Sequence, residues 1–344
     1  MDFGLHGDVR ALQQGTRALL DRACPPSAVR AAWTSPTGRS ESLWRALAEA
    51  GLLGIAAPPD LGGLGLDEEA LIAVLEECGR AALPEPVAEV AAGAVPLLFH
   101  AAPEAARELI PAMIEGRTRV ALVLPGRTLV PDAHVADLLL VAHGGELHAV
   151  PRAAAAIELE TSVDGARRLF RVTCAPTAAT RIAGDAAAAI TETELRLALG
   201  AAAELLGLAG SMLDRTVAYA KLRTQFGQPI GAFQAVKHQL ADALIALELA
   251  RPTVLRAAWS MRQHSACSGT HVSIAKAFAS DAGLACARAA LQVHGAIGYS
   301  FEYDLHLWMK RAWALAAAWG DAAHHREQVA RAVLDTPLDN AGDM

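Results

Sequence analysis

The sequence is poor in aromatic residues, which make up 5% of its 344 positions, and it has few residues that favour strands. Alanine and leucine raise the hydrophobic fraction to 53% instead, and this composition predicts a mostly helical protein. No apolar run approaches the roughly 18 residues that a membrane span needs. The N-terminus also lacks a basic region followed by an apolar stretch, so we expect a cytoplasmic protein without a targeting segment.

Clustered basic residues and closely spaced cysteines are missing too. The formal net charge is −7 and no dense run of lysine and arginine occurs, which argues against a nucleic-acid-binding protein. The five cysteines stand singly, without the paired spacing of a zinc site or a redox motif. No pair of histidines has the setting of metal ligands. We therefore expect reduced thiols and no metal site.

The order of helical and strand-like segments indicates three domains. Residues 1–117 have the pattern of helices with short breaks, and residues 185–344 have the pattern of long helices that form a four-helix bundle. Between them, residues 118–184 contain short strand-prone runs separated by Gly, Asp and Pro. These runs are Val120–Leu124, Leu138–Val141, Glu146–Val150 and Leu169–Thr173. The predicted fold class is mainly α with a small, truncated β domain in the middle.

The most informative stretch runs from Arg223 to Asp242 and separates two long Ala/Leu-rich helical patterns. Its glycines and Pro229 predict a tight reversal between two antiparallel helices. The tip of this hairpin would carry a cation, Arg223, an aromatic ring, Phe226, and an amide, Gln234, beside the N-terminus of the second helix. Free backbone amides and the helix dipole favour an anion there, so the set suits a nucleotide.

Two motifs in this region are similar to those of a known family. The first is Arg-x-x-Phe-Gly-x-x-Ile-x-x-Phe-Gln, from Arg223 to Gln234, and the second is Gln-x-x-Gly-x-x-Gly-Tyr, from Gln292 to Tyr299. In this order on a helical background, they resemble the acyl-CoA dehydrogenase superfamily. The resemblance implies that the motifs grip the adenine and pyrophosphate of an FAD held mainly by the neighbouring subunit. The implied cofactor-binding residues are Arg223, Gln225, Phe226, Ile230, Phe233, Gln234, Gln292, Gly295 and Ala296.

The middle of the chain departs from that family. Family members have a β domain about twice as large, in which a Thr-Glu-Pro-x-Ala-Gly-Ser-Asp loop and a Trp strand cover the flavin and contact the thioester. In this chain only Leu124-Pro125-Gly126 corresponds to the loop, and the Trp strand is absent. Ala296 also replaces the second of two adjacent glycines, which puts one methyl group where the family brings its backbone close to the pyrophosphate.

The catalytic base of the family has no counterpart at its usual positions. Members use a glutamate after the last core helix, and alignment through Met309-Lys310-Arg311 places Trp319 there. A second family position falls at Leu197. Two acids, Glu194 and Glu204, lie on the same predicted helix as Leu197. Glu204 stands in an apolar run and is a candidate base with a raised pKa, although an ion pair with an arginine from another helix explains it equally well. We assign no catalytic residue with certainty from the sequence.

The resemblance therefore implies a subunit of a heteromeric enzyme that dehydrogenates an acyl-CoA thioester. A full-length homologue would supply the catalytic glutamate and most of the FAD site in an α2β2 heterotetramer, and an electron-transfer acceptor would reoxidise the flavin. This arrangement is similar to that of actinobacterial dehydrogenases that act on steroid side-chain CoA thioesters. Two alternatives remain: a homodimer that uses Glu204 as its base, and a scaffold that has lost flavin.

Overall fold

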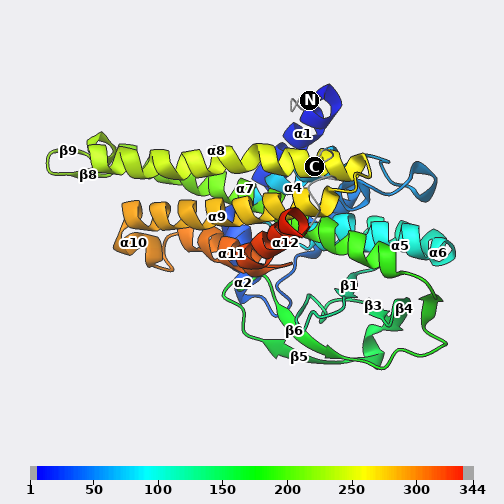
Figure 1. Cartoon of the computed structure of the whole chain (residues 1–344). Helices are drawn as coiled ribbons and strands as arrows, with labels where there is room; N and C mark the ends of the chain where they lie inside the picture. The colour runs from blue at the N-terminus through cyan, green and yellow to red at the C-terminus, as the bar shows by residue number, and fades with distance from the viewer. Residues whose placement is uncertain (1–5, 336–344) are drawn as a thin grey trace. The chain divides into compact units, whose positions relative to one another are not determined.

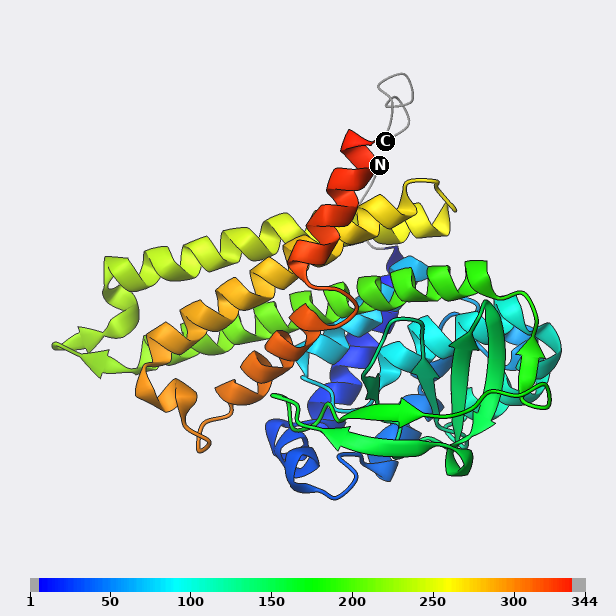
Figure 2. The ribbon, with the colours of Figure 1, turned by 60° about the horizontal axis from the view of Figure 1, so that its bottom comes forward.

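The structure, a computed structural model, describes residues 6–335 and is mainly helical with a small β region, as the composition predicted (Figures 1 and 2). The α-helices are α1 (Gly7–Ala23), α2 (Pro26–Thr34), α3 (Glu41–Glu49), α4 (Glu68–Arg80), α5 (Val95–Ala101), α6 (Pro103–Ile114), α7 (Ala187–Leu222), α8 (Gln234–Arg262), α9 (Ser268–His294), α10 (Ala296–Tyr299), α11 (Leu305–Ala317) and α12 (Ala322–Leu334). Shorter turns of helix are η1 (Leu52–Gly54), η2 (Pro59–Leu61), η3 (Glu89–Ala94), η4 (Arg152–Ala154) and η5 (Ile230–Ala232).

The strands form three small sheets. The four-stranded sheet has the order β1 (Val120–Val123), β3 (Leu138–His143), β4 (Glu146–Pro151), β7 (Arg181–Ala183), and the three-stranded sheet has the order β2 (Val130–Pro131), β6 (Leu169–Thr173), β5 (Ala156–Glu160). A two-stranded ribbon pairs β8 (Thr224–Gln225) with β9 (Gln228–Pro229). The four strands expected from the sequence are present to within two residues, whereas the short strands β2 and β7 and the largely exposed strand β5 were missed.

Contacts divide the chain into two compact units. The helical unit contains Ile72–Leu83 and the described parts of Met1–Asp21 and Ala198–Met344, and the mixed unit contains Arg22–Leu71 and Pro84–Leu197. The boundaries of the three domains expected from the sequence stay a prediction.

Three long helices, α7, α8 and α9, dominate the helical unit, and α9 packs against α8, α11 and α12. The prediction that Pro252 breaks or kinks the second helix after Arg251 was wrong in its end point, because α8 continues to Arg262. Proline removes one backbone donor from a helix. Pro252 lies on the exposed side, and the helix buries Leu247 and Val254 on either side of it, so packing maintains the helix through the proline.

Two glycines allow α4 and α7 to approach closely in the helical unit. A Cβ on Gly79 of α4 would lie 2.0 Å from the backbone oxygen of Glu204, and a Cβ on Gly207 of α7 would lie 1.8 Å from the backbone oxygen of Glu76. Both values are far below any normal contact, so only glycine permits this crossing.

Helix α7 is long and apolar enough to cross a membrane, which corrects the expectation that no segment approaches that length. However, 89% of its most apolar window is buried inside the fold. A helix that is apolar on all sides is typical of a protein core as well as of a membrane span. Among the described residues no other helix passes this test.

Helix α12 begins at a charged cap. The carboxylate of Asp321 accepts a hydrogen bond of 2.8 Å from the backbone N–H of His324, and this hydrogen bond holds the pKa of Asp321 below its ordinary value of 3.8. We expect Asp321→Ala to lower the free energy of unfolding by about 1 kcal/mol, measured by urea denaturation.

The same cap predicts a pH effect. Because the pKa of Asp321 is lower in the folded state, its stabilisation is present above pH 3.8 and is lost as the pH falls through the folded value. Asp321→Asn keeps an acceptor at the cap and removes the titration, so the stability difference between wild type and this variant should shrink in acid. A difference independent of pH would contradict this assignment.

In the mixed unit, the two larger sheets enclose a small apolar core. Its buried side chains come from both sheets and the segments between them: Ala121, Val130, Ala133, Ala136, Leu139, Val141, Val150, Ala155 and Phe170. A two-sheet sandwich of this size needs support from neighbouring helices. Buried ion pairs contribute to this support. Arg39 binds Asp132, and Arg119 donates to Glu85 at 3.3 Å. The guanidinium of Arg119 also lies 4.4 Å above the Trp44 ring. Burial raises the pKa of Glu85, and the charges of Arg39 and Arg119 oppose that rise.

Candidate cofactor site

The predicted reversal after α7 is a two-stranded hairpin, β8–β9, whose central residues are Phe226 and Gly227. Their φ angles are +52° and +78°, and positive values at both positions are typical of the turn that matches the twist of a two-residue hairpin. At the base, the backbone N–H of Ile230 donates to the carbonyl of Arg223 at 2.8 Å. The strand pairing therefore puts Phe226 at the tip of the hairpin, and Figure 1 shows the hairpin at one end of α7 and α8.

Phe226 combines two unfavourable features. Its side chain is 91% exposed, and its backbone adopts the left-handed conformation that bulky residues avoid. Its ring lies edge to face with the ring of Phe233, with centroids 6.1 Å apart. Strain and exposure at one aromatic residue indicate that Phe226 does not stabilise its own unit and instead contacts another molecule.

The other predicted residues of the first motif lie around this hairpin. Arg223 and Gln225 are exposed, Ile230 is half-buried, and Gln234 is the exposed first residue of α8. Within the part of the chain that the structure describes, the guanidinium of Arg223 makes no hydrogen bond and no ion pair. Its charge is therefore available to a ligand.

The second motif forms the end of α9 and the turn that follows. Gln292 is exposed on the last turn, and Gly295 caps the helix with φ +65° and ψ −144°, a conformation nearly restricted to glycine. A Cβ at Gly295 would meet nothing within 4 Å, so open space lies beside its backbone. Ala296, the departure from the family pattern, is exposed at the start of α10, where its methyl group touches solvent.

Both motifs are at the same end of the helical unit. The ring of Tyr219, one turn before Arg223, stacks on His294, the residue before Gly295, with centroids 4.3 Å apart. Figures 1 and 2 agree in placing the hairpin and α10 at this end. A nucleotide could reach an arginine, an aromatic ring and a bare glycine turn together, so the residues fit part of a dinucleotide site.

Trp319, at the usual position of the family base, lies in a turn that buried polar groups hold. Its φ is +58° and that of Gly320 is +96°. The ammonium group of Lys276, fully buried, donates to the carbonyls of Ala316 at 3.1 Å and Gly320 at 2.9 Å. His325 donates to the carbonyl of Trp319 at 3.0 Å. The turn is intact, but an indole cannot accept a proton.

The second base position is occupied by an apolar side chain as well. Leu197 is fully buried, and a Cβ on Gly93 would lie 3.1 Å from its side chain. Glu194 lies 3.5 Å from Arg127, the residue after the remnant of the shortened loop, and this ion pair is not the setting of a base. Glu204 is half-buried at the close crossing of α4 and α7, and its catalytic role stays a prediction.

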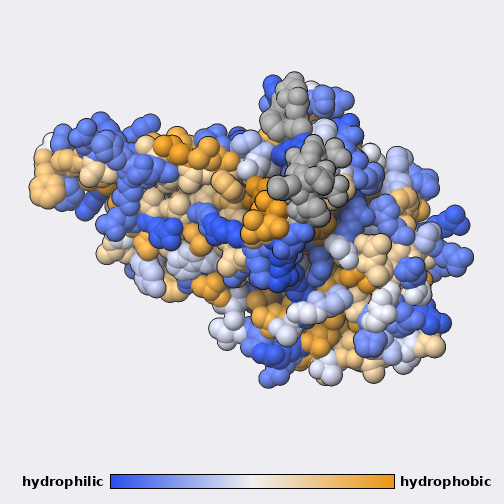
Figure 3. Space-filling model, viewed as in Figure 1, coloured by the Kyte–Doolittle hydropathy of each residue, from blue (hydrophilic) through white to orange (hydrophobic). Residues whose placement is uncertain are grey.

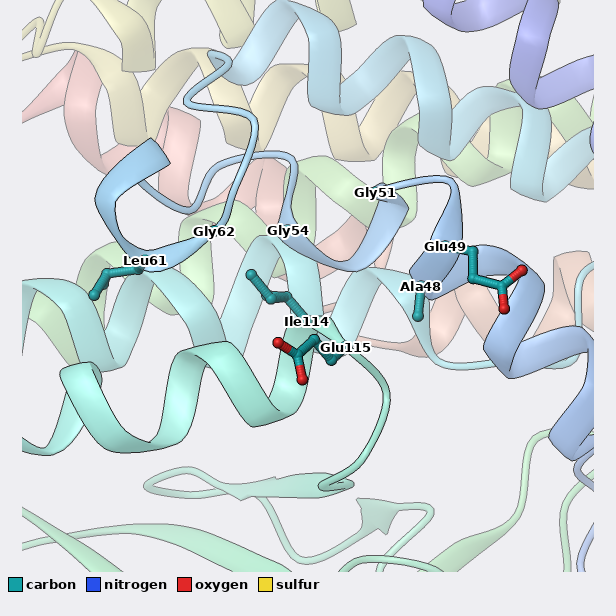
Figure 4. Close-up of a pocket in the computed structure, with 8 residues that line it drawn as sticks. All are labelled: Ala48, Glu49, Gly51, Gly54, Leu61, Gly62, Ile114 and Glu115. Atoms are coloured by element: carbon teal, nitrogen blue, oxygen red, sulfur yellow. The ribbon is translucent and has the colours of Figure 1, made fainter.

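A pocket of about 230 Å³ lies in the mixed unit (Figure 4), and none of the predicted site residues lines it. Its lining comes from α3, the glycine-rich turns and α6: Ala48, Glu49, Gly51, Gly54, Leu61, Gly62, Ile114 and Glu115. Both carboxylates are exposed, and Glu115 pairs with Arg117. Gly51 and Gly62 have positive φ values, as turns require, so the glycine loop is explained by the fold alone.

Residues 6–335 contain no group of three or more His, Cys, Asp and Glu side chains that could hold a metal ion. No disulfide joins any of the five cysteines. Two residues that the sequence analysis did not single out, Tyr219 and His294, prove to connect the motifs. Tyr219 lies one turn before Arg223, and His294 directly precedes Gly295, and these positions were the available signal.

Comparison with known proteins gives consistent results. Residues 7–117 match the family described as acyl-CoA dehydrogenase, N-terminal domain, and residues 188–334 match acyl-CoA dehydrogenase, C-terminal domain. The chain is 35% identical over 321 residues to acyl-CoA dehydrogenase IpdE2 of Mycolicibacterium smegmatis, covering 93% of this chain and 96% of that protein.

Solved structures show the same relationship. The ChsE4-ChsE5 complex from Mycobacterium tuberculosis is similar with a TM-score of 0.90 and 26% identity, covering 98% of this chain and 100% of the matched chain. The Tcur3481-Tcur3483 steroid ACAD gives a TM-score of 0.86 and 27% identity, covering 95% and 98%.

Proposed function

This chain belongs to the acyl-CoA dehydrogenase family, whose members bind FAD, and from that premise we propose that it is one subunit of a heteromeric acyl-CoA dehydrogenase. In this proposal the chain lends half of an FAD site across an interface, and a full-length homologous subunit provides the rest. The two subunits form an α2β2 complex in the cytoplasm that oxidises the Cα–Cβ bond of an acyl-CoA thioester.

The observation that carries the proposal is the hairpin end of the helical unit. An exposed phenylalanine in a strained conformation, an arginine without an ion pair among the described residues, and a glycine turn beside open space meet there. Arg223 would clamp the pyrophosphate, because a guanidinium pairs two phosphate oxygens at once. Phe226 would stack on the adenine, and Gln234, Gln292 and the Gly295 turn would complete the grip.

The exposed apolar surface near this end supports the proposal that a partner subunit binds there. Large apolar side chains are unusually exposed there: Leu222, Phe226, Ile297, Tyr299 and Phe301. The exposed faces of α8 and α9 add Leu244, Ile245, Leu249 and Phe278, and Figure 3 shows apolar surface along these helices. Contiguous apolar surface of this kind marks protein interfaces.

The missing base supports a division of labour between subunits. Both family positions hold apolar residues, Trp319 and Leu197, so the carboxylate that takes the Cα proton would come from the partner. Bound FAD supplies the acceptor for the hydride that leaves Cβ. This chain's residues would hold the nucleotide end of the cofactor, exclude water from it and fix its position, while an electron-transfer protein would accept the electrons.

The comparisons support a narrower substrate class. One similar structure is described as a steroid ACAD, and another is a complex of two different chains. We therefore propose a CoA thioester of a steroid-derived acid as the substrate.

Flavin content after purification tests the proposal. The chain is purified alone and, separately, after co-expression with a full-length homologue that has the intact Thr-Glu-Pro loop and a usable glutamate. After desalting, visible flavin absorbance is recorded for each preparation. We expect flavin only in the co-purified complex. Flavin on the chain alone, with thioester oxidation, would overturn the proposal in favour of a homodimer. Flavin in neither preparation would overturn it in favour of a scaffold.

A further inference from the structure

Three side chains form a connected cluster beneath the proposed nucleotide grip. His294 stacks on Tyr219 at 4.3 Å between centroids, and its Nε2 lies 3.3 Å from the hydroxyl of Tyr303. The Tyr219 and Tyr303 rings meet edge to face at 6.1 Å. His294 is almost fully buried within this cluster.

The cluster connects the two motifs through short covalent paths. Tyr219 accepts the backbone hydrogen bond of Arg223 at 2.8 Å, so its position fixes the first turn below the hairpin. His294 directly precedes Gly295, and a Cβ on Gly298 of α10 would lie 2.8 Å from the Cβ of His294. The distance between the arginine and the glycine turn therefore depends on how His294 packs against Tyr219.

The hydrogen bonds define the neutral form of His294. Its Nδ1 is 2.8 Å from the carbonyl oxygen of Ala290, which can only accept, so Nδ1 carries the proton. Nε2 is then an acceptor, and the Tyr303 hydroxyl donates to it. Protonation of Nε2 would remove this acceptor and place a charge inside the cluster.

Burial disfavours that charge. From α7, Arg215 lies 3.7 Å over the Trp308 ring and interacts electrostatically with Tyr303 and Asp304. Helix α10 contains no charged residue, and α9 itself contributes only the Ala290 carbonyl. Burial lowers the pKa of His294 below its ordinary value of 6.5, and the Ala290 hydrogen bond opposes this shift.

We propose that His294 is a positioning residue for the flavin, which in its neutral form holds the Gly295 turn at the spacing from Arg223 that the cofactor requires. The inference rests on the proposed function. It assigns to the chain a residue that does not touch the cofactor and yet sets its affinity and its pH dependence.

The test measures the affinity of the flavin-free complex for FAD by isothermal titration between about pH 5 and 8. In the wild type, we expect binding to weaken about two- to tenfold as the pH falls through the pKa of His294. His294→Phe keeps a stacked ring but cannot titrate, so its affinity should lack this decline. Tyr303→Phe removes one hydroxyl group with little disturbance of the fold and should weaken binding while keeping a pH dependence.

A matched control lies on the same helix. His271, near the start of α9, is also partly buried with a lowered pKa and bonds to Ser260 at 2.8 Å. His271→Phe should leave the pH profile of FAD binding unchanged. If His294→Phe retains the wild-type decline in an assembled complex, the inference is wrong while the proposed function stands. A wild-type complex that takes up no FAD overturns both.

Discussion

Replacing Arg223 by alanine is expected to remove flavin from the complex while leaving its assembly and stability unchanged. The guanidinium makes no hydrogen bond or ion pair with the rest of the described chain, so the fold loses nothing with it. A charge-assisted bond to phosphate contributes about 1.5 to 3 kcal/mol, which corresponds to roughly a ten- to 150-fold change in affinity. Flavin content of the purified complex and the dissociation constant for added FAD measure this loss.

Two further variants separate the possible causes. Arg223→Lys keeps the charge but loses the planar fork, so it should restore only part of the affinity. Arg331→Ala removes an exposed arginine of α12 that pairs with Glu327 one turn earlier, and it should leave the flavin content intact. Full flavin content in Arg223→Ala would show that the hairpin arginine does not hold the cofactor.

Replacing Gly207 by alanine is expected to lower the free energy of unfolding of the helical unit by more than about 3 kcal/mol. A loss of this size prevents folding when the protein is only marginally stable. The new Cβ would stand 1.8 Å from the carbonyl oxygen of Glu76 and 2.6 Å from the backbone nitrogen of Arg80. Both are backbone atoms of α4, which cannot rotate away as a side chain can. Relief therefore requires the two helices to separate, which exposes the apolar side chains that they bury. Urea denaturation followed by circular dichroism measures the change.

Gly210, less than one turn further along α7, provides a matched control. A Cβ there would have Leu247 as its nearest neighbour at 3.9 Å, an ordinary contact. Gly210→Ala should therefore stabilise the protein by up to about 1 kcal/mol through helix propensity. If both glycine variants change stability by similar amounts, the close crossing of α4 and α7 is not real.

The parts of the fold that depend on local composition were predictable. Alanine- and leucine-rich runs gave the long helices, and the glycines around Pro229 gave the reversal after α7. The sequence also predicted the strands with clear apolar runs, such as β3, whose residues Leu139–Val141 are buried. The family resemblance is confirmed by the matched domains.

The features that were missed depend on contacts between distant segments. Strand β5 carries Ala156–Glu160 along an edge with mostly exposed side chains, so it lacks the apolar signal of a buried strand. Helix α8 passes through Pro252 because α9 packs along it, which no local rule anticipates. The stacking of Tyr219 on His294 joins residues 75 positions apart in the sequence. The FAD-binding roles of the hairpin residues stay a prediction.

The backbone of the turn at Trp319 is stabilised independently of the side chain at that position. Lys276 and His325 grip its carbonyl oxygens, and these bonds are indifferent to the side chain that residue 319 carries. A backbone turn that is held in this way tolerates different side chains at position 319. The backbone of the turn can therefore keep its shape when the side chain at position 319 changes, so the frame of the fold and the chemistry at this position can vary independently.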